Sequence, residues 1–505
     1  MNKRSISLEE YSLEINRRGG RRLDADCRAF PDGNGSSPGK RAFLPFFLPP
    51  FHLLFRFLAL PHTPSGRIRQ RPTVLHRIVH RNAGSNGRTD GGRILSRGGF
   101  YISLPSGNSQ SNKPSGDSAI SSGTTGNTAG SSSSGQTTTT TTGPTTTSPS
   151  VTPSGKIIAG YYAGWSSYKG YTPDKIPANR LTHLHYAFAK IDPSANAVAL
   201  ADPSNDRKNF AALRKLKQRQ PALKTLISIG GWDYSTYFSD VASSAARREA
   251  FAQSCLEFIL EHGFDGIDLD WEYPVSGGLA GNTNRPQDKQ NFTLLLQAIR
   301  EKLNRQSAKD GRQYYLTIAG AANTSYLSKI EPAKVSALVD YLFVMSYDIH
   351  GPWDSYADLN APLYKPQESS PQYKNSVYDG IRAYLDKGVP AKKLILGMPF
   401  YGYLYQGVSG RNNGLYSSFR SAKAISYDSL RKDYLNNSAY AKLWHDIARV
   451  PYLYGNDSFI SYEDPSSIAA KAGLAKSLKL GGVGAWELSH DTSGALLDSA
   501  YKALR

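Results

Sequence analysis

The chain has 505 residues, of which 39% are hydrophobic and 20% charged, and its formal net charge is +19. This composition is typical of a soluble protein with room for two or three domains, or for one large barrel with extensions. Only two cysteines are present, Cys27 and Cys255, which excludes a disulfide framework and a cysteine-based zinc site. No recognition motif accompanies the basic charge, so we expect no nucleic-acid partner.

Residues 1–103 are rich in Arg, interrupted by Gly and Pro, and lack sustained hydrophobic periodicity. Their most apolar part, Phe43–Leu60, contains three prolines as well as His52 and Arg56, so we expect neither a transmembrane helix nor a membrane partner. The same part lies too far from Met1 to serve as a signal peptide. We therefore expect residues 1–103 to be disordered or not to belong to the mature protein.

Residues 104–155 form a low-complexity tract of Ser, Thr, Gly and Pro, including six consecutive threonines at Thr137–Thr142. Such a tract cannot bury enough apolar surface to offset the entropy of ordering it. The sequence therefore predicts a flexible linker here, followed by a folded domain over residues 156–505.

Short apolar strands alternate with helical patterns through residues 156–505. Helical periodicity marks Ala245–His262, Asp288–Arg305 and Tyr378–Lys387. The expected strands are Ile157–Ala163, Leu181–Ala189, Lys224–Gly230, Gly266–Tyr273, Tyr315–Ala321, Tyr341–Asp348, Leu394–Tyr401 and Gly482–Leu488. Eight repeats of strand and helix predict an α/β fold, a (β/α)8 TIM barrel of parallel strands.

The segment between the seventh strand and a last crossover helix near Ser466–Leu478 is too long for a single helix. It is rich in Tyr and includes Trp444 and the apolar run Val450–Tyr454. We expect a small α+β insertion over about residues 404–465, beside the barrel mouth.

The fourth expected strand carries a row of acids, Asp268, Asp270 and Glu272. Side chains alternate along a strand, so these acids share one face, roughly 6–7 Å apart, while Ile267, Leu269 and Trp271 share the other. The apolar face must pack on the surrounding helices, which directs the acids into the barrel, with Glu272 nearest the mouth. Active sites of such barrels lie at the carboxyl ends of the strands.

Carboxylates packed this closely cannot all ionise at low cost, so the sequence predicts a proton retained and shared among them. Such coupling supplies a protonated carboxylic acid near neutral pH, as general acid catalysis requires. A network of ion pairs is the alternative explanation. It is disfavoured because no matching row of Lys or Arg occurs on the neighbouring strands.

The run Asp265-Gly-Ile-Asp268-Leu-Asp270-Trp-Glu272 resembles the DxxDxDxE signature of glycoside hydrolase family 18, the chitinase family. Ser228-Ile-Gly230-Gly231-Trp232 resembles the second signature of that family. The resemblance covers about residues 156–505. It implies hydrolysis of β-1,4 bonds between N-acetylglucosamine units, with retention of configuration and assistance from the substrate itself.

The resemblance also implies roles for individual residues. Glu272 is expected to protonate the glycosidic oxygen, Asp270 to hold the acetamido N–H, and Asp268 to exchange charge and a proton with Asp270. Tyr347 is expected to hydrogen-bond the acetamido group. The residues expected to have structural roles are Asp265, Ser228, Gly230 and Gly231.

Sugar rings stack on aromatic side chains through their C–H faces. The substrate-binding residues that the resemblance implies are Tyr161, Phe188, Trp232, Met345, Asp348, Trp353, Tyr401 and Trp486. One position departs from the family pattern. Many relatives carry Arg where this chain has Tyr403, which leaves the contact of that residue with substrate open.

The resemblance implies no metal and no other cofactor, a monomer, and chitin and its oligosaccharides as partners. A polymeric substrate and a flexible linker lead us to expect secretion. Two alternatives remain open. One is another family 18 hydrolase, such as an endo-N-acetylglucosaminidase or a peptidoglycan-active enzyme. The other is a non-catalytic chitin-binding lectin, although such lectins typically lose the acid at the position of Glu272.

Overall fold

The computed structural model describes residues 155–369 and 375–505, which all belong to one compact unit. The predictions for residues 1–103 and for nearly all of 104–155, including Cys27 and Phe43–Leu60, lie outside the described residues. Among the helices of the described segments, none is both long and apolar enough to cross a membrane.

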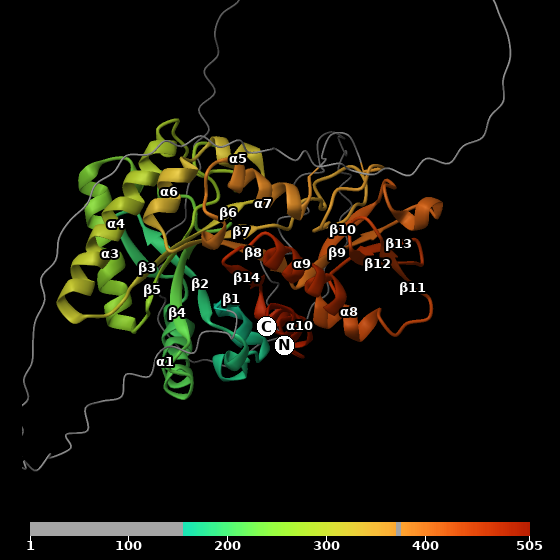
Figure 1. The fold of residues 1–505 in the computed structure, drawn as a ribbon, viewed down its shortest axis with the longest axis horizontal. Coiled ribbons are helices and arrows are strands. Elements are labelled where there is room, and N and C mark those ends of the chain that lie inside the picture. Colours follow the sequence, from blue (N-terminus) through green and yellow to red (C-terminus); the bar gives the residue numbers. More distant parts are fainter. Residues whose placement is uncertain (1–154, 370–374) are drawn as a thin grey trace, which may run out of the picture. The chain divides into compact units, whose positions relative to one another are not determined.

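Eight parallel strands form a closed barrel, which confirms the predicted fold (Figure 1). In barrel order they are β1 (Ile157–Ala163), β2 (His183–Asp192), β4 (Lys224–Gly230), β5 (Gly266–Asp270), β6 (Tyr315–Ala321), β7 (Tyr341–Met345), β8 (Leu394–Pro399) and β14 (Gly482–Trp486). The ring closes because β1 pairs with β14 on one side and with β2 on the other. A short strand that the sequence did not predict, β3 (Ala197–Leu200), pairs antiparallel with the end of β2.

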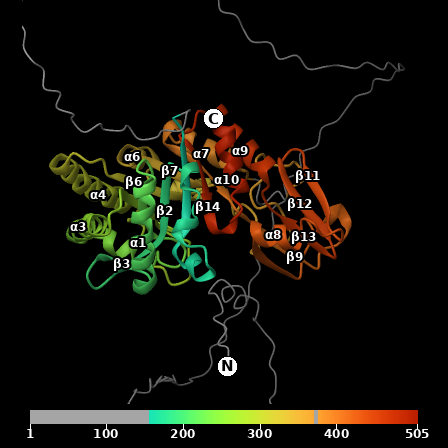
Figure 2. The same ribbon diagram turned by 90° about the horizontal axis from the view of Figure 1, so that it is seen from below.

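Helices surround this barrel (Figures 1 and 2). They are α1 (Pro203–Arg219), α2 (Phe238–Ala242), α3 (Ala245–His262), α4 (Asp288–Asp310), α5 (Thr324–Ser328), α6 (Pro332–Leu338), α7 (Val377–Asp386), α9 (Pro465–Ser477) and α10 (Ala495–Leu504). The bounds of α3 match the prediction because both of its ends are capped. The Ser244 side chain accepts a hydrogen bond from the Arg247 amide at the start, and Gly263 adopts a left-handed conformation at the end.

A second, antiparallel sheet lies to one side of the barrel, coloured orange in Figure 1, and comes directly after β8. Its strands are β9 (Tyr401–Gln406), β10 (Ser421–Ser426), β11 (Ala441–His445), β12 (Val450–Gly455) and β13 (Ser458–Ser461), accompanied by α8 (Tyr427–Asp433). Just after β13, the buried carboxylate of Glu463 accepts hydrogen bonds from Lys471 Nζ on α9, with both distances 2.7 Å. This ion pair ties the end of the inserted sheet to a helix of the barrel.

The outward face of β5 is apolar, as the alternation of its residues predicts. Ile267 and Leu269 are fully buried, and the Trp271 ring stacks on Phe238 of α2 with centroids 5.3 Å apart. Cys255 of α3 is a buried free thiol, as predicted. The inward face of β5 is consequently left to the acids.

Candidate active site

The acids of β5 lie in a row that runs from the barrel interior to its mouth. Asp268 is fully buried, Asp270 is 4% exposed, and Glu272 is half-buried beyond the end of the strand. β5 ends at Asp270, earlier than its predicted end at Tyr273. The chain leaves the ladder there because the Glu272 amide donates to the Ser235 hydroxyl, at 2.9 Å, and makes no strand hydrogen bond.

Hydroxyl groups from three other strands surround Asp268. Tyr161 of β1 and Ser228 of β4 donate to its Oδ2, each at 2.8 Å, and Thr317 of β6 donates to its Oδ1 at 2.6 Å. His185 Nδ1 of β2 lies 3.2 Å from the same Oδ2. Burial raises the pKa of Asp268, but the His185 imidazole and these hydrogen bonds outweigh burial and hold the pKa below its ordinary value.

The two acids nearer the mouth behave in the opposite way. Asp270 is buried and its Oδ1 has no hydrogen-bond partner in the described part of the chain. Its burial, followed by the charges of Glu272 and Asp268, raises its pKa well above the ordinary value. Burial likewise raises the pKa of Glu272 to about 7, despite a hydrogen bond from Tyr273, with the charges of Asp348 and Asp233 adding to the rise.

The row is therefore graded. Hydrogen bonds and the imidazole lower the pKa of the deep acid, whereas burial raises the pKa of the two acids toward the mouth, so a proton in the row is held more tightly by Asp270 and Glu272 than by Asp268. A protonated carboxylic acid at the opening of a barrel, with an anion behind it, can donate a proton to a substrate oxygen and later take one from water.

Asp348 lies just past β7, beside the same opening, and is solvent-exposed. The hydroxyls of Tyr401 and Tyr403 both donate to its Oδ1, at 2.5 and 2.7 Å, and its own amide donates to Asn360 Oδ1 at 2.8 Å. Although the residue is exposed, desolvation by the surrounding protein raises the pKa of Asp348. Tyr403, the residue that departs from the family pattern, is thus a direct partner of Asp348.

Tyr347, the neighbour of Asp348, is buried, and its ring meets the edge of Tyr401 at a centroid distance of 6.1 Å. Met345 ends β7 and is half-buried. Burial, followed by the nearby charge of Asp270, raises the pKa of Tyr347 well above its ordinary value, so its hydroxyl stays a donor. The structure thus brings Tyr347 into the electrostatic environment of the acid row.

Three of the predicted aromatic residues form one cluster at the mouth. Trp486 stacks on Phe188 at a centroid distance of 5.7 Å and meets the edge of Tyr161 at 5.4 Å. Trp165 extends the cluster, because its ring stacks on Phe188 at a centroid distance of 6.3 Å. Trp165 is 42% exposed. Trp165 was not predicted, although an exposed Trp directly after a barrel strand is a signal that could have been used.

Trp232 and Trp353 follow β4 and β7 at the carboxyl end of the barrel and are 46% and 61% exposed. Because both residues are exposed, each of the two rings is accessible to a ligand. The Trp353 ring meets the edge of Tyr403 at 5.8 Å, which joins the wall around Asp348 to this outer aromatic surface.

The two signature glycines allow close approach of other groups. Both have positive φ, 107° for Gly230 and 76° for Gly231. A Cβ on Gly230 would lie 2.2 Å from the Asp270 carbonyl oxygen, and one on Gly231 would lie 2.6 Å from the Phe188 ring. Only glycine fits both the conformation and the space.

Asp265 faces away from the row. It pairs with Lys217 at 2.6 Å and accepts the Thr225 amide at 2.8 Å, contacts that tie α1 and β4 to β5. Ser228, by contrast, was predicted to have a structural role but contacts the acid row directly through Asp268.

The residues that sequence reasoning missed lie deeper in the barrel. His185 of β2 faces Asp268, and Tyr341 of β7 places its hydroxyl 2.6 Å from His185 Nε2. Thr317 also escaped prediction. The alternation of His183 and His185 on β2 is a signal for two inward-facing histidines, although it does not reveal their partners.

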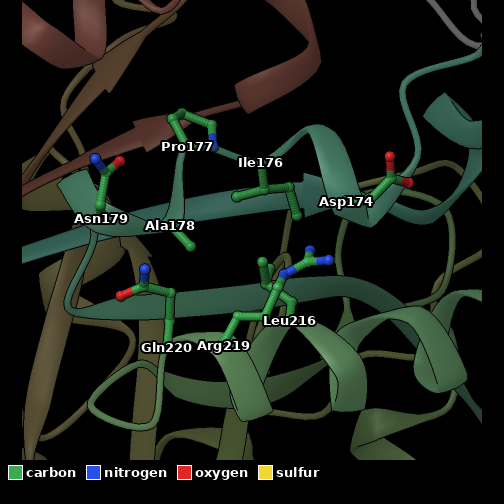
Figure 3. A pocket seen from close by; sticks show the side chains of 8 residues that line it. All are labelled: Asp174, Ile176, Pro177, Ala178, Asn179, Leu216, Arg219 and Gln220. Atoms are coloured by element: carbon green, nitrogen blue, oxygen red, sulfur yellow. The ribbon is translucent and has the colours of Figure 1, made fainter.

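Within residues 155–369 and 375–505, no group of His, Cys, Asp and Glu side chains is arranged to hold a metal ion. A shallow depression on the outside of the barrel, shown in Figure 3, lies between α1 and the segment that precedes β2. Its lining residues are Asp174, Ile176, Pro177, Ala178, Asn179, Leu216, Arg219 and Gln220. None of them belongs to the acid row or to the aromatic cluster.

Residues 157–491 match the family model described as glycosyl hydrolases family 18. The chain is 42% identical over 398 residues to chitinase A1 of Niallia circulans, covering 67% of this chain but only 57% of that protein. It is 33% identical to chitinase B of Serratia marcescens, covering 66% of this chain and 78% of that protein.

Solved structures agree with these matches. Chitinase ChiA74 from Bacillus thuringiensis is 34% identical with a TM-score of 0.66, and the match covers 69% of each chain. Ostrinia furnacalis Group IV chitinase, solved with allosamidin, is 30% identical with a TM-score of 0.64, covering 69% of this chain and 98% of that one. A family 18 N-acetylglucosaminidase from Paenibacillus barengoltzii is 33% identical with a TM-score of 0.63, covering 69% and 99%.

Proposed function

Because the chain belongs to the glycosyl hydrolases of family 18, we propose that it is a chitinase. Its substrate is chitin, and it hydrolyses β-1,4 bonds between N-acetylglucosamine units with retention of configuration. The observation that carries this proposal is the graded row of acids, in which the pKa of Asp268 is lowered, the pKa of Asp270 is raised, and the pKa of Glu272 at the mouth is raised to about 7. The chitinase relatives support the choice of substrate.

In the proposed reaction, Glu272 donates its proton to the glycosidic oxygen while the acetamido oxygen of the substrate attacks the anomeric carbon. The C–O bond to the leaving sugar breaks, and the sugar becomes a positively charged oxazolinium. Asp270 accepts a hydrogen bond from the acetamido N–H as this charge develops, and Tyr347 donates one to the acetamido oxygen. Glu272, now a carboxylate, then takes a proton from the water that opens the oxazolinium.

The binding roles follow from position. Trp486, with Phe188 and Tyr161 beside it, lies at the mouth and offers an apolar floor to the sugar that reacts. Asp348, with one carboxylate oxygen taken by Tyr401 and Tyr403, offers its other oxygen to a sugar hydroxyl. Trp232 and Trp353 are platforms for sugars farther along the chain. We further propose that the protein acts outside the cell as a monomer.

An N-acetylglucosaminidase that acts at chain ends is the second candidate function, favoured by the likeness to the enzyme from Paenibacillus barengoltzii. The inserted sheet β9–β13 argues for the chitinase, because its tyrosines Tyr401 and Tyr403 extend the wall of the cleft beyond the acid row. A lectin is disfavoured because a half-buried Glu272 with a raised pKa is ready to donate a proton.

Turnover of N-acetylglucosamine tetramers and pentamers tests the proposal. We expect dimers as a principal early product, released as the β-anomer, as NMR at short times can show. Oligomers of glucosamine without the acetyl group lack the nucleophile and should not be cleaved. Allosamidin should inhibit. Release of monomer alone would favour the N-acetylglucosaminidase, and binding without any hydrolysis would leave the lectin.

A further inference from the structure

A histidine lies behind the acid row, on the side away from the cleft. The inward positions of β2 are occupied by His183 and His185, and His185 is fully buried. Its Nδ1 lies 3.2 Å from Asp268 Oδ2, without the alignment of a hydrogen bond, and its Nε2 lies 2.6 Å from the Tyr341 hydroxyl. The imidazole therefore bridges Asp268 and a tyrosine of β7.

The groups that face His185 come from β1, β5 and β7. Tyr161 of β1 packs against the imidazole with ring centroids 4.6 Å apart, and its hydroxyl donates to Asp268. Tyr341 of β7 meets the imidazole at a centroid distance of 5.9 Å. His183 lies farther down on β2, between the rings of Tyr315 and Tyr341. Within the described residues, His185 is the one basic side chain that contacts Asp268.

The mechanism proposed above uses Asp268 as an anion but does not say what keeps it ionised. Three hydroxyl donors alone leave a buried carboxylate without a positive charge nearby. Placing a negative charge in a dry barrel interior is costly unless charge or hydrogen bonds compensate. The His185 imidazole lies 3.2 Å from this carboxylate and is the neighbouring side chain that can provide the compensation.

We propose that His185 is a positioning residue that keeps Asp268 anionic, so that the proton shared by Asp268 and Asp270 stays on Asp270. This inference rests on the proposed function, because it concerns the same acids. The proton that stays on Asp270 neutralises the acid beside Glu272, so Glu272 has one charged neighbour fewer when it must re-ionise. Tyr341 holds the imidazole in place by its contact with Nε2.

The pH dependence of kcat/KM on N-acetylglucosamine oligomers tests this role. Removing the imidazole makes Asp268 easier to protonate, so the acid loses its active, ionised form at a higher pH. In His185→Asn we expect the acidic limb of the profile to move up by about one pH unit, the size typical of losing a neighbouring group that favours the charged form of a carboxyl. The alkaline limb should move much less.

His183→Asn is the matched control. His183 is the other inward histidine of β2, and its ring contacts Tyr315 and Tyr341 but makes no contact with Asp268. Its variant should keep the wild-type acidic limb at a comparable melting temperature. If His185→Asn fails to fold, Tyr341→Phe serves in its place, because it removes only the hydroxyl that holds Nε2, and it should shift the limb in the same direction by less.

Two results overturn the inference while leaving the chitinase proposal intact. One is a His185→Asn profile that is lower than wild type at every pH but unshifted, which indicates a structural role alone. The other is an equal shift in His183→Asn. Failure of the chitinase proposal is distinguishable, since the wild-type protein would then cleave none of the oligomers.

Discussion

The pKa values of the carboxylic acids shift in opposite directions at two places in the barrel, the floor around Asp268 and the mouth around Glu272 and Asp348. On the floor, Asp268 is dry but surrounded by hydroxyl donors and an imidazole, and its pKa is lowered. At the mouth, burial by the surrounding protein raises the pKa values of Glu272 and Asp348, the charge of Asp348 adds to the rise at Glu272, and the hydroxyls of Tyr401 and Tyr403 only reduce the rise at Asp348. Asp268 is buried as well, so the difference comes from its hydrogen-bond donors and the adjacent imidazole, which outweigh burial on the floor but not at the mouth.

We expect the largest loss of activity when the proton donor at the mouth is removed. Glu272→Gln keeps the shape of the side chain but cannot donate a carboxylic proton, so we expect kcat to fall by about 10²–10⁴. Affinity for the oligomers, measured by calorimetry, should change little. Asp265→Asn is the control. It lies in the same signature but faces Lys217 and Thr225, so it should keep kcat while the melting temperature falls.

The dependence of wild-type activity on pH is the second test of the difference between floor and mouth. The pKa of Glu272 is raised to about 7, so the acid is protonated below that pH and loses its proton as the pH rises through it. Activity should therefore fall on the alkaline side, by about tenfold for each pH unit above the limb. An alkaline limb several units higher would mean that Glu272 is not the group that titrates.

Removing one hydroxyl from the floor should have an intermediate effect. Ser228→Ala deletes a donor to Asp268 Oδ2. Hydrogen bonds to a charged group are worth about 1.5–3 kcal/mol, so a loss of roughly tenfold or more in kcat/KM is expected, together with an upward shift of the acidic limb. An unshifted limb would contradict the view that hydroxyl donors keep Asp268 ionised.

Removing one hydroxyl from the mouth should have the smallest effect. Tyr403→Phe deletes a donor to Asp348, but Tyr401 still donates to the same oxygen. We expect KM to rise by about three- to tenfold, as for the loss of one hydrogen bond, with kcat little changed. A kcat effect as large as that of Ser228→Ala would remove the distinction between floor and mouth.

Hydrophobic alternation along the sequence predicted the barrel because the barrel strands have an apolar outward face and most of the connections between them carry a helical pattern. The predicted strands ran too far at their carboxyl ends. Tyr273, Asp348 and Leu488 continue the apolar or alternating pattern, but β5, β7 and β14 end before them. Beyond these ends the chain leaves the sheet, and a residue pattern does not show where strand hydrogen bonding stops.

The partners of the acids were less predictable than the acids themselves. Asp268, Asp270 and Glu272 are neighbours on one strand, so alternation alone places them together. The donors to Asp268 come from β1, β4 and β6, and the donors to Asp348 come from β9, beyond the barrel strands. Such contacts depend on the closure of the barrel and on the position of the inserted sheet, which local pattern does not specify.

The surroundings of Asp268 also link catalysis to the cooperativity of folding. Its contacts come from β1, β2, β4 and β6, so the set of donors that lowers the pKa of this acid exists only while those strands stand together in the ring. Local opening of any one of them would raise the pKa of Asp268 before the whole domain unfolds. Hydrolytic activity in mild denaturant should therefore disappear ahead of the helical signal, and a chain cut between β4 and β5 should regain it only when its two fragments reassemble.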